Sequence, residues 1–207
     1  METARKRRAA TRLGRWLAAL LWLTAVALPA VAEDGKRWRA GAYSFSDELG
    51  GFTILSASGV GTRDDPVILT QEFYSASPVT LVIRAEAPIR LYSFDGKFAN
   101  GFLRLVVVAR NASGLAWSEF EFELQETLGQ PSVFGDGLSF NQREVGQDSV
   151  FSTGFARHQR DFEPYDRLIF TEGTVDPGKQ ADFGFLISDF TPKLTFFLVQ
   201  DPRIPLS

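Results

Sequence analysis

The feature that most constrains the fold is a run of short, apolar and β-branched segments, each closed by a turn signal, from Phe52 onward. Such residues favour a pleated sheet, and after residue 33 no stretch of ten or more places apolar residues at helical spacing. The expected strands are 52–55, 66–73, 79–85, 89–94, 102–110, 115–125, 148–156, 167–173, 181–188 and 194–200. Short strands with turns about every 8–12 residues predict an all-β fold, an antiparallel β-sandwich of immunoglobulin-like or jelly-roll type.

Alternation within these segments indicates the buried faces. Residues 105–109 read Leu-Val-Val-Val-Ala, and this continuous apolar run predicts a central strand covered on both sides. In the other segments about every second residue is apolar, as in a strand with one buried and one solvent-exposed face. The side chains expected in the core are Leu81, Ile83, Leu105, Val107, Phe120, Phe122, Phe183, Phe185 and Phe196.

The first 32 residues have the composition of a secretory signal peptide. A basic segment at Arg5–Arg8 precedes an apolar stretch at 16–29, and Ala30-Val31-Ala32 supplies the small residues that signal peptidase requires. The alternative is an uncleaved anchor, but the apolar run is short for a membrane span and an Ala-x-Ala ending has no use in one. We therefore expect a signal peptide at 1–32 and a single domain at 33–207, periplasmic or secreted in a bacterium.

Removal of residues 1–32 changes the charge of the protein. Six of the 22 Lys and Arg residues leave with one of the 25 acids, so 16 basic and 24 acidic residues remain, a net charge of −8. That balance argues against nucleic acid or an anionic membrane surface as a partner. We expect no membrane span after signal removal and an unknown protein or glycan as partner.

The chain contains no cysteine, so an exported domain of this sequence is disulfide-free. All 19 phenylalanines follow the signal segment, and burial of these rings is the expected source of stability. The lack of cysteine also removes thiol nucleophiles and thiolate metal sites. We expect no cofactor.

Three glutamates at two-residue spacing are the first candidate site. In the stretch Trp117–Glu126, strand geometry places Trp117, Glu119, Glu121 and Glu123 on one face, with Phe120 and its neighbours on the other. The structural interpretation is an amphipathic strand whose glutamates are exposed to solvent. The functional interpretation is an acid/base set for hydrolysis of a glycosidic bond.

The Glu-x-Glu-x-Glu spacing resembles the catalytic strand of the family-16 glycoside hydrolases, where Glu-x-Asp-x-Glu lies on the concave face of a jelly-roll sandwich. The resemblance implies Glu119 as nucleophile, Glu121 as its support and Glu123 as acid/base. The central residue departs from the family pattern, since this chain has Glu121 rather than Asp. Near the C-terminus, residues 173–192 resemble the late hairpin of bacterial immunoglobulin-like secreted modules. No family matches the whole chain.

Two segments interrupt the expected strands. Residues 126–147 form a long connection with at most one short strand near 138–141, and residues 157–167 are the densest ionic stretch. Long loops on a β scaffold often carry binding sites. The second segment, which holds the only histidine, is the candidate ligand-binding loop, with the residues Arg157, His158, Arg160, Asp161 and Tyr165.

Acidic residues in glycine-rich turns are candidates for a calcium site. Asp64, Asp65 and Asp136 supply oxygen ligands of the kind that calcium prefers, but none follows the spaced Asp-x-Asp-x-Asp pattern of a loop site. Ordinary turn chemistry explains the same residues, so we expect no metal.

Together these features favour an exported, non-catalytic β-sandwich protein, a binding or structural module of unknown ligand. One alternative is a glycan-acting hydrolase that uses Glu119, Glu121 and Glu123. Another is a subunit of a cell-surface assembly that pairs through an exposed strand edge.

Overall fold

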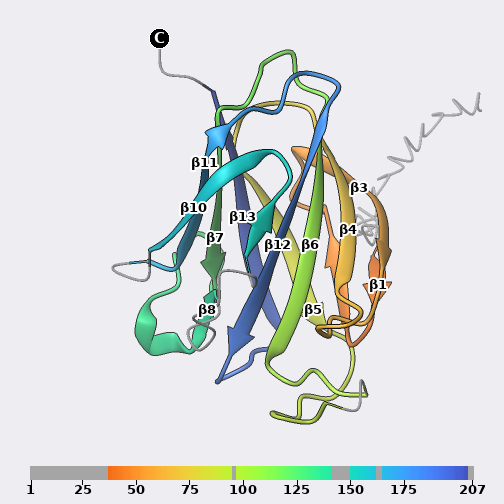
Figure 1. Ribbon diagram of the computed structural model, residues 1–207. Helices are drawn as coiled ribbons and strands as arrows, with labels where there is room; N and C mark the ends of the chain where they lie inside the picture. Colours follow the sequence, from red (N-terminus) through yellow and green to blue (C-terminus); the bar gives the residue numbers. More distant parts are fainter. Residues whose placement is uncertain (1–36, 95–96, 141–149, 162–164, 205–207) are drawn as a thin grey trace, which may run out of the picture. The chain divides into compact units, whose positions relative to one another are not determined.

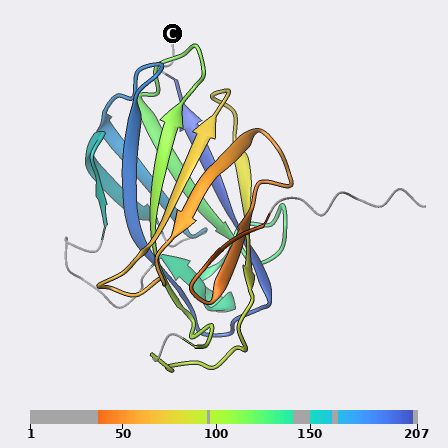
Figure 2. The ribbon, with the colours of Figure 1, turned by 90° about the vertical axis from the view of Figure 1, so that its right-hand side faces the viewer.

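The computed structural model describes residues 37–94, 97–140, 150–161 and 165–204, and these build two β-sheets with a common core (Figure 1, Figure 2). Sheet A has the order β1 (Trp38–Ala40), β2 (Tyr43–Ser46), β5 (Val79–Ala85), β13 (Thr195–Arg203), β7 (Glu119–Gln125), β11 (Arg167–Gly173), β10 (Phe155–Asp161). Sheet B has the order β3 (Phe52–Ser58), β4 (Val67–Phe73), β6 (Phe102–Asn111), β12 (Gln180–Asp189), β8 (Leu138–Phe140), with β9 (Phe151–Ser152) also paired to β12. The predicted all-β sandwich is confirmed, whereas the expected signal peptide lies outside the described residues.

One strand pair departs from the expected antiparallel arrangement. β4 and β6 are parallel, from Val67 opposite Leu105 to Phe73 opposite Asn111. Between them the chain crosses to sheet A, runs back as β5 and then returns to sheet B, so it reverses direction twice. Two reversals leave β4 and β6 pointing the same way. The other strand pairs in the described residues are antiparallel.

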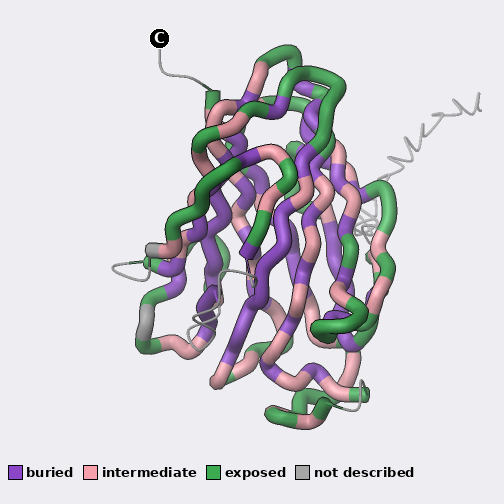
Figure 3. The backbone as a smooth tube through the Cα atoms, viewed as in Figure 1, coloured by how far each residue is buried: buried purple, intermediate pink, exposed green. Residues whose placement is uncertain are grey.

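The core lies between the inner faces of the two sheets, and it is dominated by phenylalanine. All nine side chains that the sequence assigns to the core are buried. Rings from both sheets meet there: Phe120 of β7 lies 4.6 Å from Phe183 of β12, centroid to centroid. Gln200 of β13 also donates a buried 2.7 Å hydrogen bond to Gln71 of β4. Figure 3 shows the resulting alternation of buried and more exposed residues along several strands.

Two expectations about individual strands are wrong. Residues 89–94 form turns, with a single bridge between Ile89 and Ala99, because Tyr92 has a φ of 59°, a left-handed conformation that a strand cannot contain. In β6, Val106 and Val108 are half-buried, not covered on both sides. Only the inner face of β6 contacts the core, so apolar residues on its outer face gave a misleading signal.

The expected ionic loop at 157–167 is also wrong, since its first half is strand β10 and its last residue begins β11. β10 is the outermost strand of sheet A, and residues 156–159 are exposed. Charged side chains are common on such edge strands. Because neither face of β10 is apolar over its length, the sequence lacked the alternation that marks a strand.

Candidate functional site

The glutamates of β7 lie on the outer face of sheet A, between β13 and β11. Phe120, Phe122 and Leu124 point into the core and are fully buried. Register places Glu119 opposite Arg203 of β13 and Glu123 opposite Arg167 of β11. The sequence therefore identified correctly the two faces of β7 itself.

The glutamates are not the solvated row that an amphipathic strand predicts. Glu121 and Glu123 are only 6% and 8% exposed, and Glu119 is half-buried. The long side chains of Arg203 and Arg167 contact them from both neighbouring strands. Carboxylates removed from water in this way need a charged partner, and the arginines supply it.

Arg203 is shared by three carboxylates. Its Nη2 lies 2.7 Å from Oε2 of Glu121, its Nε lies 3.0 Å from Oδ2 of Asp201, and its Nη1 lies 3.8 Å from Oε2 of Glu119. The first two contacts are hydrogen bonds, whereas the contact with Glu119 is a longer ion pair. One guanidinium group thus contacts carboxylates from two strands, β7 and β13.

Arg167 holds the other end of the row. Its Nη2 and Nε lie 2.7 and 2.8 Å from Oε2 of Glu123, and its Nε lies 3.6 Å from Oε1 of Glu121. The amide of Gln125 donates a 2.9 Å hydrogen bond to Oε1 of Glu123 and accepts one from the backbone of Gly129. Glu123 is therefore held on both oxygens.

The network contains more negative than positive charge. Four carboxylates (Glu119, Glu121, Glu123 and Asp201) share the two guanidinium groups of Arg167 and Arg203. Burial raises the pKa of Glu121, the two arginines oppose the rise, and the charges of Asp201 and Glu123 add to it. Burial would lower the pKa of Arg203, but its hydrogen bond to Asp201 and the charge of Glu121 outweigh that effect and raise it.

Trp117 does not share the face of the glutamates, contrary to the expectation from strict alternation. It is fully buried, with its ring 5.6 Å from those of Phe73 and Phe120. The strand begins only at Glu119, and Trp117 forms a separate bridge with Val175. The alternation is interrupted at Ser118, so the indole is part of the core.

Glu119 and Glu123 are four residues apart on one strand, the same spacing as the outer glutamates of the family-16 strand that they resemble, so spacing alone does not distinguish hydrolysis from binding. Retention also needs one carboxyl group that can donate a proton and one carboxylate that can attack. Arg203 and Arg167 lie along the row and engage its carboxylates. This geometry is better suited to binding a charged group than to acid/base work.

An open cleft of about 540 Å³ adjoins the network where β7 begins and β13 ends. It is lined by Ala76, Ser118, Glu119, Asp201, Pro202, Arg203 and Ile204. Three of these are charged members of the network, and the apolar ones form the rest of the wall. The cleft thus gives a ligand access to Glu119, Asp201 and Arg203.

The candidate ligand-binding loop is divided by the strand geometry of β10. Register places Arg157 opposite Thr171 and Asp161 opposite Arg167, and the side chains of His158 and Arg160 lie on the other face from that of Arg157. Arg157 pairs with Glu172 at 3.0 Å.

His158 and Tyr165 contact residues of β11. The ring of His158 lies 6.1 Å from that of Phe170, and burial together with the charge of Arg160 lowers the histidine pKa. Tyr165 stacks under the guanidinium of Arg167 at 5.2 Å. Arg157, His158 and Tyr165 therefore contact different residues and do not converge on one site.

Of the acidic turn residues, Asp136 has a structural role through its side chain. Both carboxylate oxygens of Asp136 accept backbone hydrogen bonds, from Val133 and Leu138, each at 3.0 Å. Asp64 and Asp65 lie in the β3–β4 turn, where the backbone carbonyl of Asp65 accepts three N–H groups. Within the described residues, no group of three or more His, Asp or Glu side chains could hold a metal ion.

Two buried aspartates were missed by the sequence analysis. Asp166 is fully buried; Ser139 donates a 2.7 Å hydrogen bond to its Oδ1, and its Oδ2 has no partner among the described residues. Burial raises the pKa of Asp166 to about 6. The hydrogen bond from Ser139 opposes this rise, and the charge of Asp136 adds to it. It precedes Arg167 in an ordinary ionic stretch, and nothing in the sequence distinguished it.

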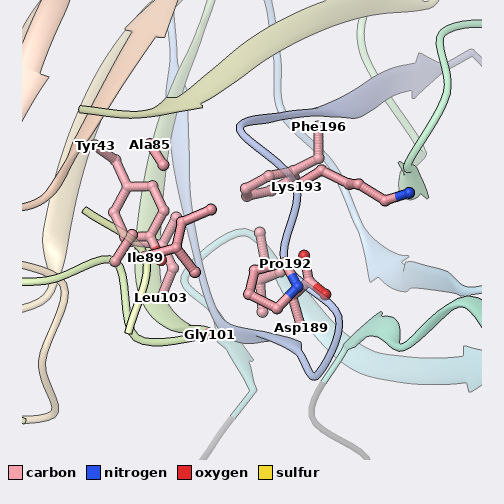
Figure 4. Close-up of a pocket in the computed structure, with 11 residues that line it drawn as sticks. Tyr43, Ala85, Ile89, Gly101, Leu103, Asp189, Pro192, Lys193 and Phe196 are labelled. Carbon is pink, nitrogen blue, oxygen red and sulfur yellow. The ribbon is translucent and has the colours of Figure 1, made fainter. Parts of the chain in front are cut away.

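Asp189 is the second, at the end of β12. It lines a small cavity of about 10 Å³ together with Tyr43, Gly101 and Lys193 (Figure 4). Burial raises the pKa of Asp189 to about 6 despite a backbone hydrogen bond from Thr191. Burial and the charge of Asp189 raise the pKa of Tyr43 to about 12. The cavity has room for about one water molecule, which is too little for an organic ligand.

No protein-family model matches this chain, and no curated protein gives a significant match. Over the described ranges, no helix has the length and apolar character needed to cross a membrane.

Proposed function

We propose that the protein is an exported, non-catalytic β-sandwich module that binds a partner through the outer face of sheet A and its cleft. The observation that carries the proposal is the sharing of Arg203 among three carboxylates at the rim of an open cleft. A preorganised charged network beside an accessible cavity is typical of a recognition surface, where charges select the partner and fix its orientation.

Binding accounts for the network better than hydrolysis does. A glycosidase needs one carboxylic acid that can donate a proton and one carboxylate that can attack or activate water. Here Glu123 is held on both oxygens by Arg167 and Gln125, and Glu121 is held by Arg203. Trp117, which could have stacked against a sugar, is in the core.

A hydrolysis screen on soluble β-glucans tests the non-catalytic assignment. We expect no release of reducing sugar from the wild-type protein. Hydrolysis that is lost in both Glu119→Gln and Glu123→Gln, with the fold intact by circular dichroism, would contradict the proposal and support the glycoside hydrolase alternative.

Export is supported by the basic, apolar and Ala-x-Ala segments of residues 1–32. The mature protein should begin at Glu33 and be found in the periplasm or the medium. N-terminal sequencing of material recovered from those fractions checks this, and a sequence that still began near Met1 would contradict it.

The edge of sheet A supports a second candidate, a subunit of a cell-surface assembly. In the described part of this sheet, β10 pairs only with β11, so its other backbone edge is open to a further strand. His158→Pro would remove a backbone donor from this edge, because the register of β7, β11 and β10 directs the N–H of His158 away from β11. If the edge is an interface, analytical ultracentrifugation should show that the wild type self-associates and that this variant does not.

A further inference from the structure

The cleft beside β7 and β13 combines two kinds of wall. Ala76, Pro202 and Ile204 are apolar, and Ile204 is 43% exposed. The other residues of the wall include two acids: the side chain of Glu119 is 44% exposed and that of Asp201 is 21% exposed. An occupant that matches both walls has an aliphatic part and a charged end.

The charges at the rim specify the sign of that end. Arg203 is the only cation among the residues that line the cleft, and its Nε and Nη2 already donate to Asp201 and Glu121. Glu119 receives only the longer contact, 3.8 Å from Nη1. The three carboxylates around this guanidinium therefore carry an excess negative charge, and an anionic ligand would have to compete with them for it.

We propose that the cleft receives an arginine or lysine side chain from a partner polypeptide. The cationic end pairs with Glu119 and Asp201, and the aliphatic stem packs on the exposed side chain of Ile204. Long basic side chains bury their methylene groups on apolar surface while the charged head remains near water, which is the geometry that this cleft offers. The inference rests on the proposed function, because it assigns a partner chemistry to the same surface.

The charge of the rest of the protein agrees with this chemistry. Residues 33–207 carry a net charge of −8, which attracts a basic partner at long range and repels an acidic one. Association should therefore weaken as the salt concentration rises, because the charges at the rim are partly exposed and are screened.

NMR titration of ¹⁵N-labelled protein, purified after expression of the full chain, tests the proposal with three blocked tripeptides. The probes are Gly-Arg-Gly, Gly-citrulline-Gly and Gly-Glu-Gly; citrulline keeps the shape of arginine without its charge. We expect shift changes at the amides of Ser118, Glu119, Arg203 and Ile204 with the arginine probe, and much smaller changes with the other two. We also expect the shift changes to become smaller as NaCl is raised from about 50 to about 500 mM, because salt screens exposed charges.

Two variants locate the interaction. Glu119→Gln should weaken binding of the arginine probe on the order of two- to fivefold, as one half-exposed ion pair does. Asp64→Asn is the matched control, because Asp64 is exposed in the β3–β4 turn whereas Ala76 of the cleft follows the other end of β4. The control should bind the probe as the wild type does.

The outcomes separate the two proposals. Equal shifts with arginine and citrulline, or equal weakening by both variants, would overturn the cationic assignment. Shifts at the same amides with the glutamate or citrulline probe alone would overturn it while supporting the cleft as a binding surface. No shift with any probe would overturn the inference, and a later failure of every glycan and peptide tested at this face would overturn the proposed function as well.

Discussion

Two groups of buried carboxylates lie in this sandwich, and they differ in what surrounds them. On the outer face of sheet A, Glu121 and Glu123 are paired with Arg203 and Arg167. At Asp166 and Asp189, no ion pair to a cation occurs within the described residues, and hydroxyl or backbone donors take its place. Similar burial thus has different consequences.

The difference shows that the burial of a carboxylate and its pairing with a cation are independent of each other. Burial raises the pKa of Glu121 too, but the two arginines oppose it. Asp166 and Asp189 have no such opposition from a cation, and their pKa rises to about 6. The glutamates gain a stable charged network, whereas the aspartates retain charge near pH 7 at a cost in stability.

The largest expected effect comes from the apolar side of the same strand. Phe122 is fully buried and contacts Phe183 and Phe185 across the core. Phe122→Ala should reduce the free energy of unfolding by roughly 3–5 kcal/mol, measured by urea denaturation. A loss below about 1 kcal/mol would mean that the charged face, and not the phenylalanine face, stabilises β7.

Lower pH should stabilise the protein through the uncompensated aspartates. A carboxyl whose pKa is raised from 3.8 to about 6 on folding binds its proton more tightly in the folded state. Its favourable contribution is therefore complete below pH 4 and lost as the pH rises through about 6. A shift of about two units corresponds to about 3 kcal/mol for each group as an upper value.

Denaturation with urea at pH 7.5 and pH 5 measures about half of this effect, because the contribution is complete only below pH 4. The double variant Asp166→Asn and Asp189→Asn should lose most of the pH dependence, because asparagine has the same shape and no charge to titrate. Stability that is equal at the two pH values in the wild type would show that water or a nearby group compensates the aspartates.

Removal of one cation tests the compensated group. Arg203→Met keeps much of the aliphatic packing but leaves Glu121 buried beside Asp201 without its hydrogen bond. We expect a loss of about 2 kcal/mol at pH 7.5, less than for a fully buried pair because Arg203 is 38% exposed. The loss should shrink at pH 5 as Glu121 takes up a proton, and a loss that is independent of pH would indicate lost packing alone.

The smallest effect is expected at the open end of the row. Glu119→Gln removes one ion pair at 3.8 Å and also the repulsion from nearby acids. The free energy of unfolding should stay within about 0.5 kcal/mol of the wild type, because exposed ion pairs contribute little. A loss above about 1 kcal/mol would place Glu119 with the buried glutamates and would complicate its use as a binding variant.

Sequence pattern succeeded where apolar side chains recur at every second residue. The core-facing positions of β5, β7 and β12 follow from this alternation, because adjacent side chains on a strand point to opposite sides, although residues between them are also buried in these strands. The pattern failed at Trp117, where the alternation is interrupted outside the strand, and at β10, where the edge position leaves charged residues on both faces. It also missed the segment around Tyr43, whose strands β1 and β2 are short.

The sequence by itself determined the all-β class, the absence of disulfides, the phenylalanine core and the position of the glutamates on the outer face of β7. Only the tertiary structure decided that Arg203 and Arg167 lie beside those glutamates, because strands distant in sequence become neighbours only through sheet order. It likewise decided that Asp166 and Asp189 are buried. Local pattern reports which way a side chain points, whereas its partners and its exposure depend on the strands that pack around it.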